Sequence, residues 1–237
     1  MTQHFQRARN EKQRASRREA ILAAAAALLD QVPVSELTLT ELAKRAGLAK
    51  SNVLRYFESR EGVLLELYDR EYQAWLDQLS DQLQTATDIE AVAATVAATV
   101  ADRPRLCQLA ANVSALVEHN PSGEAAAAYK KSALANASRL AELIGARLGG
   151  YSVEATVALV GAVNLGIGGL WSATRPSPGM ALAYETHPEL PQLRHDLGIA
   201  LHEYVATILT GLAHREPRFP FVGSLGPLPT WSRTDPA

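Results

Sequence analysis

Residues Leu37–Tyr68 read LTLTELAKRAGLAKSNVLRYFESREGVLLELY, and their spacing predicts two short helices that meet at a glycine, followed by a much longer third helix. Thr38 stands three residues before Glu41, the arrangement in which a hydroxyl and a carboxylate each satisfy a free amide at a helix start. The first helix is therefore expected to begin directly after Thr38. Gly47 then supplies a left-handed stop at no steric cost, and Ala43 is small enough for a second helix to cross close by.

The second helix is predicted to run from about Lys50 to Phe57. Val53 and Phe57 are four residues apart and should point inward. This leaves Ser51, Asn52 and Arg55 facing outward, with Lys50, Leu54 and Tyr56 at the flanks. This outward set is short, polar and cationic, and such side chains donate to base edges and phosphates when a helix enters the ~12 Å major groove of DNA. Ser59 is placed to cap the next helix, with Arg60 in its first turn, where a phosphate would lie against the exposed amides.

The segment AGLAKSNVLRYFESREGVLLEL, residues 46–67, resembles the DNA-binding signature of the tetracycline-repressor (TetR) family of bacterial one-component regulators. The resemblance covers roughly Arg14 to Leu67 and rests on the Ala-Gly turn, the Tyr-Phe pair, the serine and basic residue that follow, and the long apolar helix. It implies an all-α fold, with an N-terminal three-helix helix-turn-helix head and a larger C-terminal helical body for ligand binding and dimerisation. It also implies base or phosphate contacts from Thr40, Lys50, Ser51, Asn52, Arg55, Tyr56 and Arg60, with the start of the first helix assisting.

Two positions depart from the family pattern. Ala49 stands where the family usually has a capping serine, which should loosen the start of the recognition helix by ~1 kcal/mol. Leu54 stands where the family usually has a tyrosine that touches the DNA backbone, so we expect apolar contact with a thymine methyl group in place of one phosphate contact. Leu54, with Arg17 and Arg18 at the amino end of the first helix, completes the set of residues expected to contact DNA.

The distribution of charge supports a nucleic-acid partner although the net charge is only −2. Residues 1–60 hold eleven Lys or Arg against six Asp or Glu, whereas residues 61–237 hold twelve against nineteen. A basic head on an acidic body is the asymmetry expected when only the head meets phosphates. The alternative is a charged segment that is merely solvated.

The bulk composition indicates a helical protein of the cytoplasm. With 237 residues, of which 47% are hydrophobic, the chain can bury one large core or two smaller ones. We expect no apolar run to approach the ~20 residues of a membrane span, and Met1–Asn10 has no signal-peptide core. The lone Cys107 excludes an internal disulfide and is typical of a reducing compartment. A membrane partner is therefore not expected.

Four segments are predicted along the chain. Residues 1–13 lack periodicity and are expected to form a mobile basic arm, either free or lying along the minor groove. Residues 14–60 make the helix-turn-helix domain, and residues 61–214 make the helical body, which starts with a lever helix of six or seven turns. Residues 215–237 hold five prolines and are expected to form an extended tail. Within the body, further helices are predicted after Asp88 and over residues 105–118, 122–148, 152–174 and 192–214, with a loop of at most one helical turn at 175–191.

The body is expected to pair with a second copy of the chain. One recognition helix of about two turns touches few base pairs, and a single small module rarely reaches useful specificity against a genome. Helices 152–174 and 192–214 are the candidates for a homodimer interface because both are apolar over more than one stripe, and the last two helices of the resembled family form such an interface. Four glycines in the first of them either allow close helix crossing or mark a kink or break: Gly161, Gly166, Gly168 and Gly169.

The helices between the lever and the dimer interface enclose a ligand pocket in the resembled family. Asn112 and Asn164 sit in apolar runs, and a buried amide must find a partner, which can be a ligand, the backbone of another helix or a water. An Ala- and Leu-rich lining would suit an unknown apolar or aromatic effector, although the aromatic residues could equally be plain core. The polar and aromatic residues of this region are Trp75, Cys107, Asn112, Ser114, His119, Tyr129, Asn136, Asn164 and Trp171, and the candidate ligand contacts among them are Trp75, Cys107, Asn112, His119, Asn164 and Trp171.

The sequence therefore predicts a sequence-specific, DNA-binding transcriptional regulator. The most favoured form is a homodimeric repressor that binds a palindromic operator through residues 50–57 and is released by a small molecule. The alternative is a helical partner-binding or architectural protein with a degenerate DNA-binding head. Catalysis is not expected, because the histidines form no H-E-x-x-H pair and Cys107 has no histidine partner in the sequence. No cofactor and no metal are expected.

Overall fold

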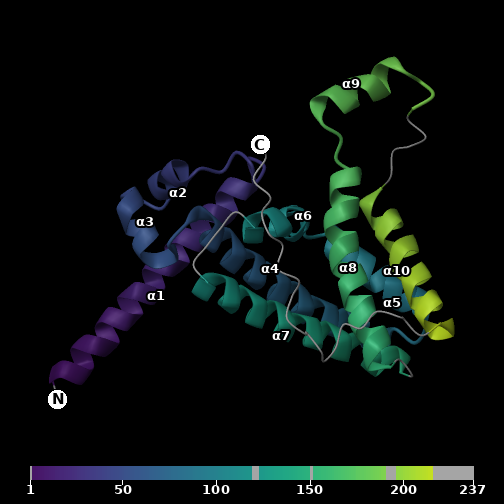
Figure 1. The fold of residues 1–237 in the computed structure, drawn as a ribbon, viewed down its shortest axis with the longest axis horizontal. Coiled ribbons are helices and arrows are strands. Elements are labelled where there is room, and N and C mark those ends of the chain that lie inside the picture. The colour runs from purple at the N-terminus through teal and green to yellow at the C-terminus, as the bar shows by residue number, and fades with distance from the viewer. Residues whose placement is uncertain (1, 119–122, 150–151, 191–195, 216–237) are drawn as a thin grey trace, which may run out of the picture.

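The computed structural model describes residues 2–118, 123–149, 152–190 and 196–215, and every regular element within these ranges is a helix. The head consists of α1–α3 and lies at one end of the molecule (Figure 1). Helix α4 runs from the head into the body, where α8 and α10 lie at the opposite end (Figure 1). The elements are α1 (Thr2–Leu29), α2 (Leu39–Arg45), α3 (Lys50–Phe57), α4 (Arg60–Gln82), the short 3₁₀ helix η1 (Leu83–Thr85), α5 (Ile89–Ala101), α6 (Pro104–Glu118), α7 (Gly123–Leu148), α8 (Val153–Ala173), α9 (Pro178–Thr186) and α10 (Leu197–His214).

Helix α1 begins much earlier than the sequence pattern suggests. Residues 2–13, predicted to form an arm separate from the first helix, continue α1 as far as Thr2. They carry no apolar stripe because this end of the helix projects away from the rest of the molecule (Figure 1). Its sequence is rich in Gln, Arg, Lys and Glu, which are good helix formers and need no apolar pattern. Periodicity therefore marks only the part of α1 that packs, where Ile21, Leu22 and Ala25 are buried.

The helix ends of the head follow the local signals in the sequence. The Thr38 hydroxyl accepts from the Glu41 amide at 3.2 Å, but the Glu41 carboxylate accepts from that hydroxyl instead of the Thr38 amide. Gly47 has a φ of +65°, and the Leu48 amide donates to the Ala43 carbonyl at 2.9 Å, which satisfies the last carbonyls of α2. Ala49 precedes α3 without any side-chain cap, as predicted.

The junction between α3 and α4 is tight. Glu58 has a φ of +61°, and the Ser59 amide donates to the Phe57 carbonyl at 2.5 Å, so the chain reverses within three residues. Ser59 then caps α4 by accepting from the Gly62 amide at 3.0 Å, which confirms the predicted cap. A Cβ on Gly62 would stand 2.4 Å from the Phe57 carbonyl oxygen, so only glycine fits. This contact fixes α3 against the first turn of α4.

The body is a bundle built around α4. Its buried face continues from Val63 in the head to Leu79 at the far end, where it packs on α5, α6 and α7. Trp75 is completely buried, and its indole N–H donates to the Thr99 hydroxyl on α5 at 3.0 Å. Helix α4 therefore contributes buried residues to the head and to the body, which share one continuous core.

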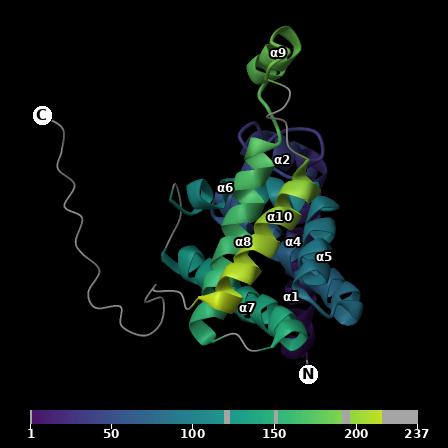
Figure 2. The ribbon, with the colours of Figure 1, turned by 90° about the vertical axis from the view of Figure 1, so that its right-hand side faces the viewer.

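Helices α8 and α10 lie side by side on the outer face of the body (Figure 2). Helix α8 runs unbroken across its four glycines, so the predicted alternative of a break is wrong. The expectation that no apolar run approaches membrane length is also wrong, because Ala155–Ala173 is long and apolar enough to cross a membrane by length and composition. Here α8 packs against α6, α7 and α10, and core helices of soluble proteins pass the same test.

The connection between α8 and α10 contains more helix than predicted. Helix α9 has nine residues instead of one turn, because Ser177 caps it and Pro178 provides a favourable first position. It stands away from the bundle (Figures 1 and 2), and none of its residues is buried. Helix α10 starts at Leu197, with the Asp196 carboxylate accepting from the Ile199 amide. Residues 192–195, predicted to begin this helix, and residues 216–237 of the predicted tail lie outside the described residues.

Candidate nucleic-acid interface and body cavity

Helix α3 presents one face to solvent and one face to the head core. Val53 and Phe57 are buried, with exposed fractions of 0% and 5%. Four of the residues predicted to contact DNA on this helix are exposed, with Ser51 and Arg55 away from the buried face and Lys50 and Leu54 at its flank, and Asn52 is half-buried. The exposed four are Lys50, Ser51, Leu54 and Arg55. The arrangement offers two cations, a hydroxyl and a leucine to one external surface, a mixture suited to phosphates, base edges and a thymine methyl group.

Three other predicted DNA contacts are engaged within the protein. The Arg18 guanidinium donates to the Tyr56 carbonyl and to the Glu66 carboxylate, and it lies over the Phe57 ring, 4.2 Å from the centroid. Tyr56 itself is half-buried against the core. The Arg60 guanidinium donates to the Leu37 carbonyl at 3.0 Å and to the adjacent Glu61 carboxylate at 2.9 Å. Arg18 and Arg60 therefore hold the head together, with only part of each side chain left for a phosphate.

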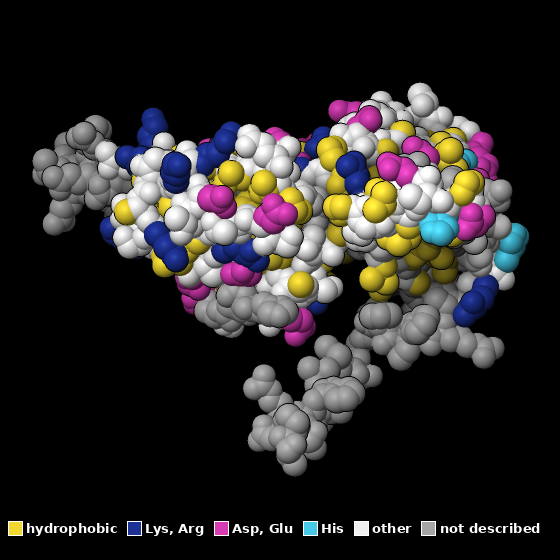
Figure 3. All heavy atoms as spheres, turned by 90° about the horizontal axis from the view of Figure 1, so that it is seen from above, with side chains coloured by type: hydrophobic (Ala, Val, Ile, Leu, Met, Phe, Trp, Pro, Cys, Tyr) yellow, Lys and Arg dark blue, Asp and Glu magenta, His cyan; other side chains and the backbone are white. Residues whose placement is uncertain are grey.

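Thr40 and Arg17 are also exposed on the head, but they lie on α2 and α1 and not on α3. The space-filling view shows Lys and Arg side chains gathered more densely over the head than over the body (Figure 3). Hydrophobic and histidine side chains are more frequent at the other end, whereas Asp and Glu side chains lie at both ends (Figure 3). On this face, the excess of basic residues found in the N-terminal sequence is therefore seen over the head.

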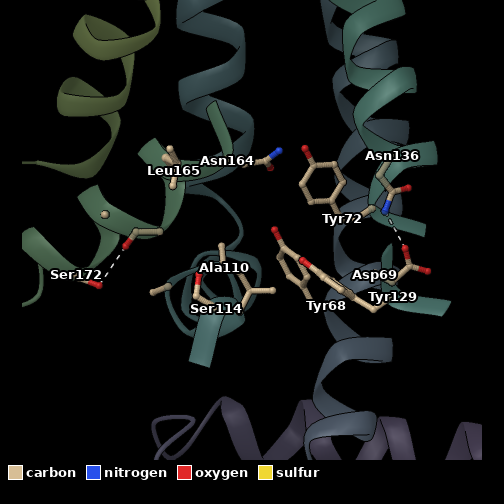
Figure 4. Close-up of a pocket in the computed structure, with 15 residues that line it drawn as sticks. Tyr68, Asp69, Tyr72, Ala110, Ser114, Tyr129, Asn136, Asn164, Leu165 and Ser172 are labelled. Atoms are coloured by element: carbon tan, nitrogen blue, oxygen red, sulfur yellow. Dashed lines mark hydrogen bonds between the residues drawn. The ribbon is translucent and has the colours of Figure 1, made fainter. Parts of the chain in front are cut away.

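The body contains a cavity of about 390 Å³ between α4, α6, α7 and α8. The phenol ends of Tyr68 and Tyr72 on α4 and of Tyr129 on α7 point into it toward α6 and α8 (Figure 4). Small and apolar residues of α6 and α8 form the facing wall. The complete lining is Tyr68, Asp69, Tyr72, Ala110, Ala111, Val113, Ser114, Tyr129, Ala133, Asn136, Asn164, Leu165, Gly168, Gly169 and Ser172.

Most polar groups of this cavity are protonated phenols or already have a hydrogen-bond partner. Burial raises the pKa of Tyr68, Tyr72 and Tyr129, so all three phenols stay protonated; at Tyr72 the neighbouring Asn164 side chain offsets part of this rise. The Asp69 carboxylate accepts from the Asn136 amide at 2.7 Å (Figure 4). The Tyr72 hydroxyl and the Asn164 Oδ1 are buried, and neither makes a hydrogen bond of good geometry with the described residues, although the two side chains are close neighbours.

Of the five predicted ligand contacts that lie within the described residues, only one lines this cavity. Asn164 does so, but Trp75 is tied to Thr99 in the core, and the Cys107 thiol is fully buried and donates to the Val100 carbonyl at 3.4 Å. Burial raises the pKa of Cys107 to about 12, so the thiol is inert as well as inaccessible. Trp75 and Cys107 are therefore core residues. For Trp75 this agrees with the predicted alternative that the aromatic residues are plain core.

Two more of the six predicted contacts lie in a second cavity, of about 610 Å³, between α6, the end of α8 and the loop after α1. There the Asn112 amide donates to the Gln108 carbonyl of its own helix at 2.8 Å, and Trp171 is covered by the Arg175 guanidinium, 4.0 Å from the ring centroid. His119 lies outside the described residues.

Sequence reasoning missed the two tyrosines of α4. Tyr68 and Tyr72 fit the apolar stripe of the lever helix as well as Trp75 does, so spacing alone could not separate cavity wall from core. The available signal was chemical. A tyrosine, unlike a leucine, needs a partner for its hydroxyl when buried, and two tyrosines one turn apart indicate that a polar space lies next to the stripe.

The head and the body are joined by α6 as well as by α4. The Arg105 guanidinium donates to the Glu71 carboxylate on α4 at 2.6 Å and to both oxygens of Asp30, at the end of α1, at 2.8 and 3.0 Å. One turn further on, the Gln108 amide donates to the Val32 carbonyl at 3.3 Å. Helix α6 therefore contacts the head and also forms a wall of the first cavity.

Comparison with known families agrees with this architecture. Residues 21–67 match the family described as bacterial regulatory proteins, tetR family, and residues 69–216 match the tetracyclin repressor-like C-terminal domain. The chain belongs to the TetR family. Its fold is accordingly that of an all-α TetR regulator with an N-terminal helix-turn-helix domain, and the alternative of an architectural protein with a degenerate head is not favoured. The matched family is one of transcriptional regulators and not of enzymes.

Individual relatives are distant over most of the chain. The HTH-type transcriptional regulator EthR of Mycobacterium tuberculosis is 45% identical over 51 residues, which is 22% of this chain and 24% of that regulator. The likeness thus spans about a quarter of the curated relative. Among solved structures, the TetR-family repressor FadR of Thermus thermophilus in complex with lauroyl-CoA has a TM-score of 0.54 at 20% identity, over 86% of this chain and 98% of that one. The fatty acid degradation regulator FadR of Bacillus halodurans has a TM-score of 0.52 at 18% identity, over 84% and 97%. At these identities the likeness concerns the fold.

Proposed function

We propose that this TetR-family chain is a homodimeric, cytoplasmic repressor that binds a palindromic operator through α3 and is released by a small molecule held in the body. The observation that carries the DNA-binding part is the outward face of α3. Lys50, Ser51, Leu54 and Arg55 are exposed there, while Val53 and Phe57 anchor the helix from behind. Thr40, Arg17 and the half-buried Asn52 extend this surface, and the free parts of Arg18, Tyr56 and Arg60 border it.

The proposed dimer interface is the outer face of α8 and α10. On α8 an exposed ridge of residues four apart runs Gly161, Leu165, Gly169; Leu165 is 76% exposed, and Leu165 and Gly169 also border the body cavity, which adjoins this face. A Cβ added at either of these glycines would meet no atom within 4 Å, so nothing inside the protomer requires a glycine there. Glycine costs about 1 kcal/mol in a helix, and close approach by a partner helix would account for it.

The other two glycines of α8 serve packing within the protomer. A Cβ on Gly166 would stand 2.6 Å from the Tyr204 ring on α10, and a Cβ on Gly168 would stand 3.0 Å from the Ala110 carbonyl on α6. The outer face of α10 is more polar than predicted, since Glu203, Thr207 and Thr210 are exposed along it. We therefore assign the apolar part of the proposed interface to α8, with α10 at its side.

The proposed effector site is the cavity lined by α4, α6, α7 and α8. The Thermus thermophilus FadR was solved with lauroyl-CoA, which supports a ligand-responsive body for this fold. In the present chain, α4 and α6 form cavity walls and also hold the head, the first through Gly62 and the second through Arg105 and Gln108. A ligand can release DNA only if it binds the tilted arrangement of these helices better than the DNA-bound one.

The test of the DNA-binding proposal uses duplexes that the full chain selects from a random pool, labelled for a gel shift. We expect Lys50→Ala and Arg55→Ala each to weaken retention of the selected duplex while the oligomeric state, read by sizing with light scattering, stays unchanged. The matched control is Lys131→Ala, which removes an exposed lysine from α7 in the body and should leave retention unchanged. Undiminished retention by both head variants would overturn the assignment of α3.

A further inference from the structure

The cavity of the body contains a pair of polar atoms that the described residues do not satisfy with good hydrogen-bond geometry. These atoms are the Tyr72 hydroxyl on α4 and the Asn164 Oδ1 on α8, which are buried and belong to neighbouring side chains. Tyr72 is only 3% exposed, and in Figure 4 its hydroxyl and the Asn164 side chain point toward each other across the cavity. A buried polar atom left unsatisfied costs about 1–3 kcal/mol. Two such atoms side by side in the lining of one cavity are a natural contact for a polar group of a ligand.

The chemistry of the pair restricts what that group can be. The Tyr72 phenol is protonated and offers a hydrogen, whereas Oδ1 of Asn164 can only accept one. A group that satisfies both must accept from the first and donate to the second. A hydroxyl and an unsubstituted amide each do this with one functional group, whereas a plain hydrocarbon does neither and a carboxylate has no hydrogen to donate.

The charges around the cavity exclude an anion from its interior. Among the described residues that line it there is no Lys, Arg or His, and the one charged group is the carboxylate of Asp69. That carboxylate already accepts from Asn136 and from the Gln73 amide, at 2.7 and 2.9 Å. An anionic ligand group placed here would lose its hydration, gain no counterion and face a second negative charge.

The rest of the lining is apolar or aromatic. The facing wall is formed by Ala110, Ala111 and Val113 of α6 and by Leu165, Gly168 and Gly169 of α8. The cavity volume, about 390 Å³, lies within the range of small-molecule sites. A ligand therefore needs a compact hydrocarbon or aromatic part as well as the polar group that meets Tyr72 and Asn164.

We propose that the effector of this regulator is a small, uncharged, largely apolar or aromatic compound whose single hydroxyl or amide group bridges the Tyr72 hydroxyl and the Asn164 Oδ1. This inference rests on the proposed function of the cavity as the effector site and adds the chemical class of the effector. It also sets this chain apart from a regulator whose ligand places charged groups in the body cavity.

The test is calorimetric titration of the full-length protein with four probes that share one hydrocarbon: para-butylphenol, para-butylbenzamide, butylbenzene and para-butylbenzoate. We expect the phenol and the amide to bind at least about tenfold more tightly than butylbenzene, the ratio that corresponds to one well-made buried hydrogen bond. The benzoate should bind most weakly. Three outcomes would overturn the proposal. These are equal affinity for the phenol and butylbenzene, tightest binding by the benzoate, and binding by none of the four probes, in which case a water would be the bridging group.

Two variants localise the effect. In Tyr72→Phe and in Asn164→Leu the advantage of the phenol over butylbenzene should shrink severalfold, because one of the two hydrogen bonds of the bridge is gone while the other remains. Asn112→Leu is the matched control, since its amide bonds to its own helix outside this cavity, and it should keep the tenfold ratio. A ratio that persists in both cavity variants contradicts the proposed bridge, and the wild-type probe series decides the matter even if a variant does not fold.

A gel shift on the same preparations separates this inference from the proposed function. Retention of the selected duplex by the ligand-free protein tests DNA binding alone. Retention without discrimination among the probes defeats only the proposed ligand class, whereas probe discrimination without retention defeats only the proposed regulator. When both hold, para-butylphenol should release the duplex and butylbenzene should do so only at about tenfold higher concentration.

Discussion

Substitution of Gly62 by alanine tests whether the contact between α3 and α4 is as tight as the structure shows. The added Cβ would stand 2.4 Å from the Phe57 carbonyl oxygen, and ordinary contact begins at 3.4 Å. The carbonyl, or the first turn of α4, must therefore move by about 1 Å. That carbonyl is backbone and already accepts from the Ser59 amide within a turn at positive φ, so it cannot rotate away as a side chain would.

The magnitude follows from two opposing effects. Overpacking a well-filled site typically costs about 1–3 kcal/mol, and replacing glycine by alanine in a helix interior gains up to about 1 kcal/mol, less in the first turn. We expect Gly62→Ala to lower the free energy of unfolding by about 1–2 kcal/mol, measured by urea denaturation with tryptophan fluorescence. Because the shift also tilts α3 relative to α4, affinity for the selected duplex should fall.

The matched control is Gly145→Ala on α7. A Cβ at Gly145 meets no atom within 4 Å, so only the gain in helix propensity remains. This variant should be more stable than the wild type by about 0.5–1 kcal/mol, with unchanged DNA affinity. If Gly62→Ala is as stable as Gly145→Ala and binds DNA like the wild type, the described junction and its role in placing α3 are wrong.

Three further predictions follow from the body. Leu165→Glu should convert the dimer to monomers in sedimentation velocity, whereas Leu134→Glu, at a similarly exposed leucine on α7, should not; a dimer that survives the first change rejects α8 as the interface. Arg105→Ala should lower the free energy of unfolding by about 1–2 kcal/mol, because it leaves the mostly buried Glu71 carboxylate unpaired. Arg139→Ala breaks a solvent-exposed ion pair and should change the free energy of unfolding by less than about 0.5 kcal/mol. Equal effects of the two changes would refute the role of Arg105. Burial raises the pKa of Cys107 from its ordinary 9.0 to about 12, so the unfolded chain loses this proton first and stability should fall as pH rises through that window. A Cys107→Ala variant should show a smaller fall. Rapid alkylation of the native thiol at pH 8 would contradict the burial.

The local features of the head could be predicted from the sequence because their causes are local. Thr38 and Ser59 cap helices three residues ahead of their partners, Gly47 takes a positive φ, and Val53 with Phe57 buries one face of α3. Each is decided by residues within one or two turns, and the sequence contains those residues in order. The positions of these helices relative to one another follow from the resemblance.

Contacts between distant residues could not be predicted in this way. Arg18 looked like a free cation near DNA, but its partners, the Tyr56 carbonyl and Glu66, lie 38 and 48 residues away. Arg60 likewise reaches back 23 residues to the Leu37 carbonyl. Charge alone does not show whether a guanidinium faces phosphate or protein, because both satisfy the same donors.

The body cavity, which we propose as the effector site, was harder still to predict, because the stripe of α4 faces two environments. Trp75 meets Thr99 in a dry core, whereas Tyr72, three residues earlier on the same stripe, reaches an open space beside Asn164. Both residues are buried, and the helical period that identifies them is the same. What separates them is the shape of the opposite wall, where α6 and α8 present alanines and glycines, and this shape depends on packing across the whole body.

The measurement that tests the central claim most directly is selection of bound sequences from random duplex DNA by the purified full-length protein. If two copies of α3 read one operator from a paired body, the selected pool should converge on a palindrome with half-sites centred about one helical turn apart, or slightly more, near the ~34–36 Å repeat of the duplex. Enrichment should be lost in Arg55→Ala. A pool without consensus, or a consensus without two-fold symmetry that Arg55→Ala still selects, would contradict the account.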